Sequence, residues 1–324
     1  MQTRAIRIYE YGGPEVLRWE TVELPAPAAG QAQIRHTAIG LNFVDIYHRS
    51  GLYPLGLPDG LGSEAAGVVE AVAPDVDGVA VGDRVVYTGR PNDAYSERRN
   101  IDAAMLVPIP DAVSDEVAAA VLLKGLTAWY LLHHSYRVQA GDPILLYAAA
   151  GGVGSLASQW ARQLGATVIG VVSTEEKAAL AKAQGCQHVL MANYDALPAA
   201  VKALTGGQGV AAVYDSVGKD TFMTSLDCLR PHGTMVTFGN SSGAVEPFAP
   251  GILAARGSLY VTRPTLVHFT DTRDKLLQAA KTLFEFIASG ATVRIGQRYA
   301  LKDAATAHRD IEARKTTGST ILLP

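Results

Sequence analysis

The sequence has few groups that could form disulfides or hold a metal through thiolates. Its 324 residues include two cysteines, Cys186 and Cys228, and no CxxC pair. Two distant cysteines cannot build a disulfide framework or a four-cysteine zinc site. We therefore expect free thiols packed in the core of a cytoplasmic protein.

A strong charge of one sign is also lacking. The formal net charge is −3, with acids and bases well mixed along the chain, so no basic face is expected to bind nucleic acid or an anionic membrane. The long uncharged run at 143–161 contains three glycines and several polar residues, which favours a buried strand, turn and helix over a membrane span. The N-terminal MQTRAIRIYEYGG alternates polar with apolar residues, which predicts a first strand rather than a signal peptide.

The chain is long enough for about two domains. Short β-rich runs alternate with helical stretches at 144–148, 167–172, 188–191, 210–216, 234–239 and 258–263, a pattern that predicts a parallel, doubly wound sheet. The first 125 residues carry frequent glycine and proline and β-type runs at 33–42 and 67–73, which predicts a mostly antiparallel, barrel-like domain. The tail, with a helical pattern at 276–288 and a strand signal at 319–323, is too short to fold alone and is expected to return to this domain.

The segment YAAAGGVGSLA at 147–157 connects the first strand of this sheet to a helix. It aligns with GxGxxG, with Ala149 in place of the first glycine. Gly151 and Gly152 still allow the backbone to approach a pyrophosphate at the helix start. A strand, this loop, a helix and a second strand in succession predict a dinucleotide-binding domain.

The end of the second strand indicates which nicotinamide cofactor binds. NAD enzymes place an acid there for the ribose 2′-OH, whereas this chain has Ser173. Ser173 and Glu176 match a helix capping box, which assigns Glu175 and Glu176 to the first helical turn. Lys177 can then reach a 2′-phosphate as a point charge. The sequence therefore predicts NADPH rather than NADH.

Several motifs together resemble the medium-chain dehydrogenase/reductase superfamily. They are GxExxG (Gly62, Glu64, Gly67), VGDRV (81–85) and AAGGVG. Within it, GGPEVL (12–17), NFVDIYHRSGLYP (42–54), KGLTAWYLL (124–132), YDSVG (214–218) and GNSSG (239–243) are similar to NADPH-dependent quinone oxidoreductases of the zeta-crystallin type. The resemblance implies an α/β fold with a GroES-like β-barrel catalytic domain (1–125 and 264–324) and a Rossmann domain (126–263). It also implies a homodimer, and the strand at 258–264 could pair edge to edge with its copy.

The sequence departs from the zinc-dependent alcohol dehydrogenase branch at the metal ligands. Asn42 stands at the position of the Cys ligand and Ser63 at that of the His ligand, so no metal is expected. Reduction of a ketone needs stabilisation of a developing alkoxide, whereas a quinone delocalises the added electrons. An acceptor of this kind is expected without zinc, and the resemblance implies zinc-independent transfer of reducing equivalents from NADPH to quinones.

The resemblance also implies the site residues. Six are implied to be catalytic: Asn42, Asp45, Tyr47, Tyr53, Lys124 and Thr127. Those implied to bind the cofactor are Asn42, Ile46, Tyr130, Gly151, Gly152, Val153, Ser173, Lys177, Tyr194, Ser216, Phe238, Gly239, Asn240, Ser241, Val261, Arg263 and Arg314. Some have simpler interpretations: Tyr53 and Tyr130 as half-buried aromatics, and Asp45 as a helix cap or a partner of Arg49.

Two alternative functions remain open. The stretch from Asn42 to Tyr53 is similar to enoyl reductases, in which Tyr53 would donate a proton after hydride attack on a conjugated C=C. A role from another class is a non-catalytic NADPH-binding, crystallin-like or RNA-binding protein. The Ser63–Glu64 pair is not expected to be a nucleophilic dyad, because no histidine is placed to relay a proton. We expect Glu64 to be a buried, paired carboxylate.

Overall fold

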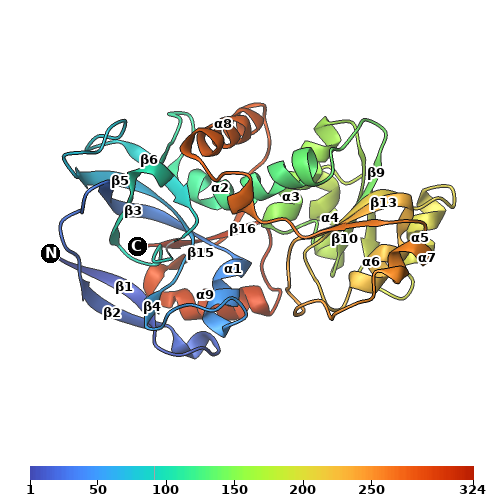
Figure 1. The fold of residues 1–324 in the computed structure, drawn as a ribbon, viewed down its shortest axis with the longest axis horizontal. Helices are drawn as coiled ribbons and strands as arrows, with labels where there is room; N and C mark the ends of the chain where they lie inside the picture. Colours follow the sequence, from blue (N-terminus) through green and yellow to red (C-terminus); the bar gives the residue numbers. More distant parts are fainter. Residues whose placement is uncertain (91) are drawn as a thin grey trace. The chain divides into compact units, whose positions relative to one another are not determined.

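The protein is described by a computed structural model over residues 1–90 and 92–324. These residues form two compact units, each coloured along the sequence in Figure 1. The first contains Met1–Lys124, Thr270–Glu285 and Val293–Pro324, and the second contains Gly125–Phe269 and Phe286–Thr292. Residues 286–292, assigned to the first domain from the sequence, thus lie in the second unit. The domain limits stated above stay a prediction.

The first unit contains two sheets. The small sheet has the order β2 (Arg18–Glu23), β1 (Gln2–Ile8), β4 (Asp59–Gly60). The large sheet has the order β15 (Ile295–Ala300), β16 (Ser319–Leu323), β3 (Gln31–Leu41), β5 (Glu64–Val72), β6 (Arg84–Thr88), β8 (Val107–Pro108), with β7 (Arg98–Asp102) also paired to β3. All pairs are antiparallel except β15 with β16. Because β16 pairs with β3, the tail returns to this unit as expected.

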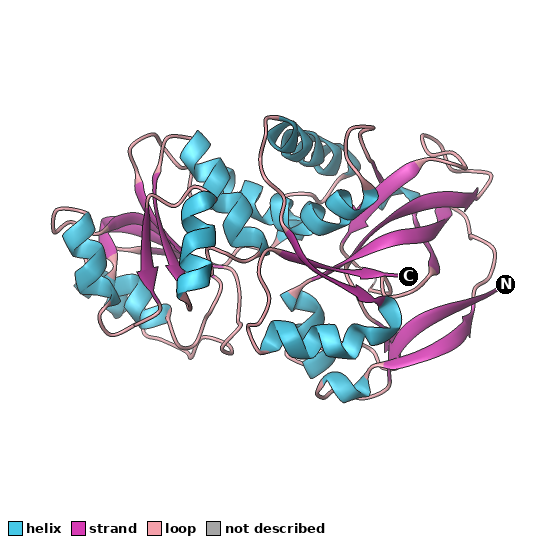
Figure 2. Ribbon diagram, turned by 180° about the vertical axis from the view of Figure 1, so that it is seen from behind, coloured by secondary structure: helices cyan, strands magenta, loops and turns pink. Residues whose placement is uncertain are grey.

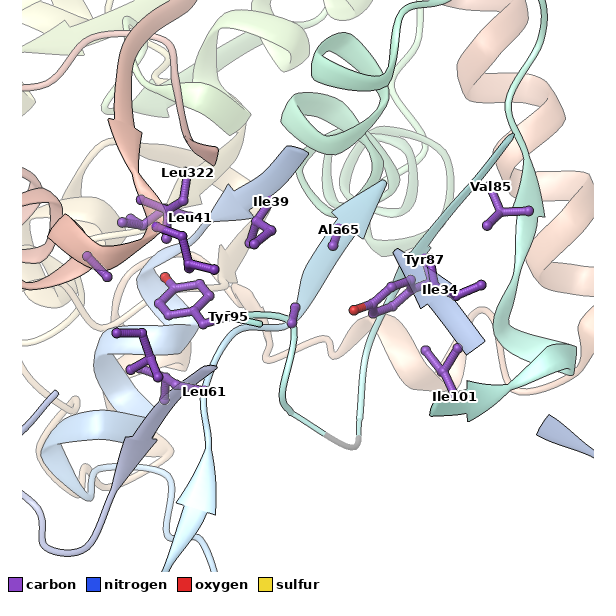
Figure 3. Close-up of a cluster of buried hydrophobic side chains, with 14 of the residues drawn as sticks. Ile34, Ile39, Leu41, Leu61, Ala65, Val85, Tyr87, Tyr95, Ile101 and Leu322 are labelled. Carbon is purple, nitrogen blue, oxygen red and sulfur yellow. The ribbon is translucent and has the colours of Figure 1, made fainter. Parts of the chain in front are cut away.

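Side chains from several of these strands point into one apolar core. Ile34 and Ile39 of β3, Ala65 of β5 and Val85 of β6 contribute to it, and each is at most 1% exposed. Figure 3 shows Tyr95 beside Leu41 and Leu61 in the same cluster. Both Tyr87 and Tyr95 are fully buried, so their hydroxyl groups require hydrogen-bond partners inside the protein.

In the described part of the chain, four α-helices belong wholly or partly to the first unit. They are α1 (Phe43–Ser50), α2 (Asp115–Tyr130), α8 (Arg273–Ala288) and α9 (Ala304–Glu312). Helix α1 begins directly after β3 and ends at Gly51, whose φ of 82° is in the left-handed region that favours glycine. Helices α1 and α9 lie side by side (Figure 1), and the Arg49–Glu312 ion pair joins them.

The second unit is a parallel, doubly wound sheet. Its order is β11 (His188–Met191), β10 (Thr167–Val172), β9 (Pro143–Tyr147), β12 (Val210–Asp215), β13 (Leu229–Thr237), β14 (Tyr260–Thr262). Helices α3 (Gly152–Gln163) and α4 (Glu175–Ala183) cover one face, and α5 (Leu197–Leu204) and α6 (Phe222–Asp227) cover the other (Figures 1 and 2). The short α7 (Gly251–Ala255) precedes β14.

The strand order places the ligand-binding edge of this sheet. Starting from β9, the chain adds β10 and β11 on one side of it and then β12, β13 and β14 on the other, so the strand order reverses beside β9. Ligands of such sheets bind outside the carboxyl ends of the strands at that point. Every β-rich run identified from the sequence in this half of the chain overlaps one of these strands. Among the described residues, no helix is long and apolar enough to cross a membrane.

Candidate active site

Glu64, at the start of β5, is a fully buried carboxylate in the first unit. Its Oε2 accepts hydrogen bonds from Asn42 Nδ2 at 2.9 Å and from Lys124 Nζ at 3.2 Å. Its Oε1 accepts from the backbone N–H of Leu123, in the interior of α2, at 2.6 Å. The expectation of a buried, paired carboxylate is therefore confirmed, and Glu64 holds the side chains of Asn42 and Lys124 together.

A close approach at Gly40 makes room for this carboxylate. A Cβ at Gly40 would lie 2.2 Å from Glu64 Oε2 and 2.3 Å from the Ala119 carbonyl oxygen. Only glycine lets β3 pass so close to both groups, since atoms at these distances overlap. The position of Glu64 thus depends on a residue that carries no side chain.

Asp45 is a second fully buried carboxylate, in the first turn of α1. Its Oδ2 accepts from the backbone N–H of Asn42 at 2.9 Å and from Tyr95 Oη at 3.1 Å, and its Oδ1 accepts from Ser63 Oγ at 2.8 Å. Asp45 is therefore a helix cap, one of the two simpler interpretations. Its other suggested partner, Arg49, pairs instead with Glu312.

Burial and hydrogen bonding act in opposite directions on the pKa of Asp45. Burial raises it, while the hydrogen bonds from Asn42, Ser63 and Tyr95 and the charge of Lys124 lower it, and the result is a pKa of about 6. The carboxylate is thus ionised at neutral pH because these donors offset part of the desolvation cost.

The aromatic candidates lie in the second half of α1 and just beyond its end. The rings of Tyr47 and Tyr53 meet edge to face, with centroids 5.2 Å apart. The backbone N–H of Tyr53 donates to the Tyr47 carbonyl at 3.0 Å. Tyr47 and Ile46 are buried, whereas Tyr53 is half-buried. The interpretation of Tyr53 as a half-buried aromatic therefore describes its packing correctly.

In the second unit, the turn from β9 into α3 has the geometry of an anion cradle. Gly151 is the N-cap of α3, without a side-chain capping bond, and no acid lies in the first helical turn. Gly154 packs against the turn so closely that a Cβ would lie 2.2 Å from the Ala148 carbonyl oxygen. Helix-start N–H groups without a capping side chain can bind a phosphate. Gly152 and Val153 are the first residues of this helix.

One detail of the predicted 2′-phosphate region is wrong. The N-cap of α4 is Thr174, whose Oγ1 accepts from the backbone N–H of Lys177 at 3.2 Å, so Ser173 and Glu176 do not form a capping box. Two adjacent hydroxyl residues offered the same local signal, and the helix begins one residue later than expected. Glu175 does lie in the first turn, and Ser173 is exposed directly after β10.

The carboxyl ends of β12, β13 and β14 bring other candidates together. Gly239 follows β13 and lies against Ser216, because a Cβ there would be 2.4 Å from the Ser216 carbonyl oxygen. The backbone N–H of Ser241 donates to the same oxygen at 3.3 Å, and Arg263 Nη1 donates to the Gly239 carbonyl at 3.3 Å. Phe238 and Asn240 flank Gly239, and Val261 lies within β14. These residues form one edge of the second unit.

The remaining candidates have separate surroundings. Tyr194, after β11, meets the ring of Tyr147 at 6.2 Å. Tyr130, at the end of α2, is buried and stacks on Phe269 at 4.9 Å, and Thr127 is half-buried on the same helix. Arg314 is exposed in the first unit, just after α9. The roles proposed for these residues stay predictions.

Two buried residues of the first unit contact the candidate site although no sequence pattern predicted them. Tyr95 donates to Asp45, and His308 Nε2 lies 3.0 Å from the Tyr95 hydroxyl oxygen. Both lie far from Asp45 in sequence, so no local pattern identifies them. The sequence indicates only their residue types: a Tyr or His that is buried requires a polar partner.

The donor set around Asn42 and Ser63 does not suit a zinc ion. Neither residue is a common zinc ligand, and Glu64 and Asp45 each already accept three hydrogen bonds. Within residues 1–90 and 92–324, no group of three or more His, Cys, Asp and Glu side chains is arranged to hold a metal ion. The absence of a bound metal in solution stays a prediction.

Comparisons with known proteins cover the whole chain. The family models described as "Alcohol dehydrogenase GroES-like domain" and "Zinc-binding dehydrogenase" match residues 28–111 and 152–289. The quinone oxidoreductase of Pseudomonas aeruginosa is 50% identical over 99% of both chains. The chain belongs to the quinone oxidoreductase family. This family lies within the medium-chain dehydrogenases/reductases, so the predicted family, fold class and oxidoreductase activity are confirmed.

Two further relatives bear on the chemistry of the family. The crystal structure of the Escherichia coli quinone oxidoreductase complexed with NADPH has a TM-score of 0.96 and 48% identity, covering 99% of this chain and all of the other. A 2-haloacrylate reductase from a Burkholderia species is 44% identical over 98% of both chains. The family therefore includes enzymes named for quinones and one named for a conjugated C=C substrate.

Proposed function

We propose that this enzyme transfers a hydride from NADPH to a quinone without a metal ion. The observation that carries the proposal is the donor set of the site. Its two buried carboxylates accept hydrogen bonds from Asn42, Ser63, Tyr95, Lys124 and a helix N–H, which leaves no ligand set for a Lewis acid. A quinone suits such a site, because its conjugated ring and oxygens spread the incoming charge.

NADPH is the proposed cofactor, and when bound it supplies the hydride. The N–H groups at the start of α3 would hold its pyrophosphate, with Gly154 keeping the helix close to the turn. Ser173 and Lys177 would bind the 2′-phosphate, since no carboxylate at the end of β10 opposes it. Gly239 and Arg263, at the carboxyl ends of β13 and β14, would line its nicotinamide half, and Ser216 would lie along its adenosine and ribose. The NADPH complex of the Escherichia coli relative supports this assignment.

In the first unit, Asn42 and Lys124 are the proposed polar contacts of the reacting groups. Glu64 fixes both side chains, so their orientation is set before a ligand arrives. The paired rings of Tyr47 and Tyr53 offer apolar surface to a planar acceptor. One hydride and one proton convert a quinone to its hydroquinone, and water can provide the proton because the oxygens of the product are basic.

Reduction of a conjugated C=C is a second candidate. The hydroxyl of half-buried Tyr53 could donate the proton that the carbanionic carbon requires after hydride attack. The Burkholderia 2-haloacrylate reductase favours this alternative, since the substrate in its name has a C=C bond.

A steady-state screen separates the two candidates. NADPH oxidation is measured with a benzoquinone, a 2-enal, a 2-haloacrylate and cyclohexanone, first for the wild type. We expect the benzoquinone to give the highest kcat/KM and cyclohexanone to give none. If the enzyme reduces the C=C substrates and not the benzoquinone, quinone reduction is contradicted as its function.

The Tyr53→Phe variant then tests the proton donor. Quinone reduction should keep most of its kcat, whereas general-acid loss should lower C=C reduction by about 10²–10⁴-fold. Tyr9→Phe is the matched control, because Tyr9 is an exposed tyrosine of the same unit whose hydroxyl donates to Glu20. An equal loss with both classes of acceptor would argue that the Tyr53 hydroxyl serves binding rather than proton donation.

We further propose a cytoplasmic homodimer. β14 is an edge strand of the second unit, and its Tyr260 is 61% exposed. An open strand edge with an exposed aromatic residue can pair with its copy about a two-fold axis. Light scattering on the purified enzyme should give twice the chain mass, and a monomer would contradict the proposal.

A further inference from the structure

A buried row of polar groups connects Asp45 with helix α9 inside the first unit. Tyr95 Oη lies 3.1 Å from Asp45 Oδ2 and 3.0 Å from His308 Nε2. His308 Nδ1 lies 3.0 Å from Arg49 Nη1. Arg49 also contacts both carboxylate oxygens of Glu312 and donates from Nε to the Gly12 carbonyl. Asp45, Tyr95 and His308 are fully buried, and Arg49 is 2% exposed.

Arg49 determines the direction of every hydrogen bond in this row. A guanidinium group has donors and no acceptor, so Nδ1 of His308 must accept from it. Burial and the charge of Arg49 lower the pKa of His308 to about 3, so the ring is neutral and its proton is on Nε2. Nε2 therefore donates to the Tyr95 oxygen, which leaves the Tyr95 proton for Asp45.

The row cannot reverse its direction. In a reversed row, a protonated Asp45 would donate a hydrogen bond to the Tyr95 oxygen and the Tyr95 hydroxyl would donate to Nε2 of His308. The proton of the neutral His308 ring would then be on Nδ1. There it would face the guanidinium of Arg49, which Glu312 and Gly12 hold in place. The row therefore presents a hydrogen to Asp45 under all conditions in which Arg49 is charged.

We propose that Tyr95 and His308 are positioning residues that keep Asp45 a hydrogen-bond acceptor and thereby hold the N-terminus of α1 for the reaction. Asp45 fixes the backbone N–H of Asn42 and the hydroxyl of Ser63. Asn42 is a proposed contact of the reacting groups, so the inference rests on the proposed function. The tail of the chain thus acts on the site through His308 without touching a ligand.

The groups around Asp45 account for its ionisation. Ser63 and Tyr95 donate to it, Lys124 on α2 lies near enough for its charge to lower the pKa, and Asn42 donates from the backbone. Glu64 and Arg49 act on the neighbouring Tyr95, whose pKa burial and the Asp45 charge raise well above its usual value. Tyr95 thus keeps its proton, and the pKa of Asp45 is about 6 with this hydrogen bond in place.

Tyr95→Phe removes the hydrogen bond to Asp45, together with the one that His308 donates to the Tyr95 oxygen, and keeps the ring. A hydrogen bond to a charged group contributes about 1.5–3 kcal/mol, and 1.36 kcal/mol is one pKa unit. We expect the acid limb of the kcat/KM profile, with NADPH saturating and a benzoquinone varied, to move up by about 1–2 pH units. His308→Gln should move it in the same direction by less, since an amide N–H near the position of Nε2 can still donate to Tyr95.

Tyr87→Phe is the matched control. Tyr87 is fully buried in the same unit and its hydroxyl lies 2.9 Å from Nε2 of His36, outside the row that reaches Asp45. This variant should be destabilised to a similar degree and keep the acid limb of the wild type. A shift of the same size in Tyr87→Phe, or an unmoved limb in Tyr95→Phe, would overturn the proposal.

A second readout does not need turnover. Titration of Asp45 makes the melting temperature depend on pH. The midpoint of this dependence should lie at a higher pH in Tyr95→Phe than in the wild type, and the dependence should be absent in Asp45→Asn. If the wild type reduces no acceptor, the proposed function fails, while this stability profile still tests the hydrogen-bonded row. If the wild type is active and the two stability profiles coincide, the row alone is refuted.

Discussion

Replacement of Lys124 by methionine tests the buried ion pair on which the site is built. Lys124 Nζ lies 3.2 Å from Glu64 Oε2, and the two side chains are 8% and 0% exposed. Lys124→Met keeps the side-chain length and leaves a carboxylate without its counter-charge in the core. Removing one partner of such a pair costs about 3–5 kcal/mol. At about 2–4 °C per kcal/mol for a unit of this size, the melting temperature should fall by about 6–20 °C.

A double-mutant cycle separates the loss of the pair from the loss of packing. Glu64→Gln combined with Lys124→Met removes both charges and keeps an acceptor for the Leu123 N–H, so about half of the lost stability should return. Calorimetry is the assay. Lys275→Met is the control, because Lys275 forms an exposed pair with Asp271 that should contribute less than about 1 kcal/mol. If Lys124→Met is as stable as Lys275→Met, or the double variant is no more stable than Lys124→Met, the argument is refuted.

Three further predictions follow from single positions. Asp45 has a folded pKa of about 6 against an ordinary 3.8, so the stability of the wild type relative to Asp45→Asn should rise by about 3 kcal/mol as the pH falls from about 7 to 3, measured by urea unfolding. A difference that does not change with pH would contradict the burial argument. Ser173→Asp should weaken NADPH binding by about tenfold or more, because the new carboxylate repels the 2′-phosphate, and should leave NADH binding nearly unchanged. Fluorescence titration measures both affinities. An equal loss for the two cofactors would contradict the assignment of Ser173 to the 2′-phosphate. Gly154→Ala places a Cβ 2.2 Å from the Ala148 carbonyl oxygen and should raise the KM for NADPH at least tenfold. The control Gly251→Ala, with open space around its Cβ, should leave this KM unchanged. Equal KM values for the two variants would show that the turn can relax.

Much of the fold could be predicted from local patterns. The strands at 167–172, 188–191 and 319–323 have the predicted bounds, because each is a compact apolar run ended by polar or turn residues. The start of α4 was missed by one residue, because Ser173 and Thr174 are equally good caps in sequence terms and the tertiary position of the chain decides between them.

The site could be predicted only where the signal was local. Asp45 lies four residues before Arg49 on one helix, so a pair was a reasonable expectation, yet Arg49 binds Glu312 from α9. The role of His308 has no sequence signature, since it depends on an arginine 259 positions away. Buried polar rows of this kind are set by strand pairing and helix docking, so the sequence alone gives their residue types without their partners.

The most direct test of the central claim is quinone-dependent NADPH oxidation by enzyme whose metal content is measured on the same sample. After treatment with a chelator, the account predicts unchanged kcat/KM for a benzoquinone at well below one metal ion per chain, and no turnover of cyclohexanone. Activity that falls with zinc content and returns when zinc is added would contradict it, as would the absence of quinone turnover in fully folded enzyme.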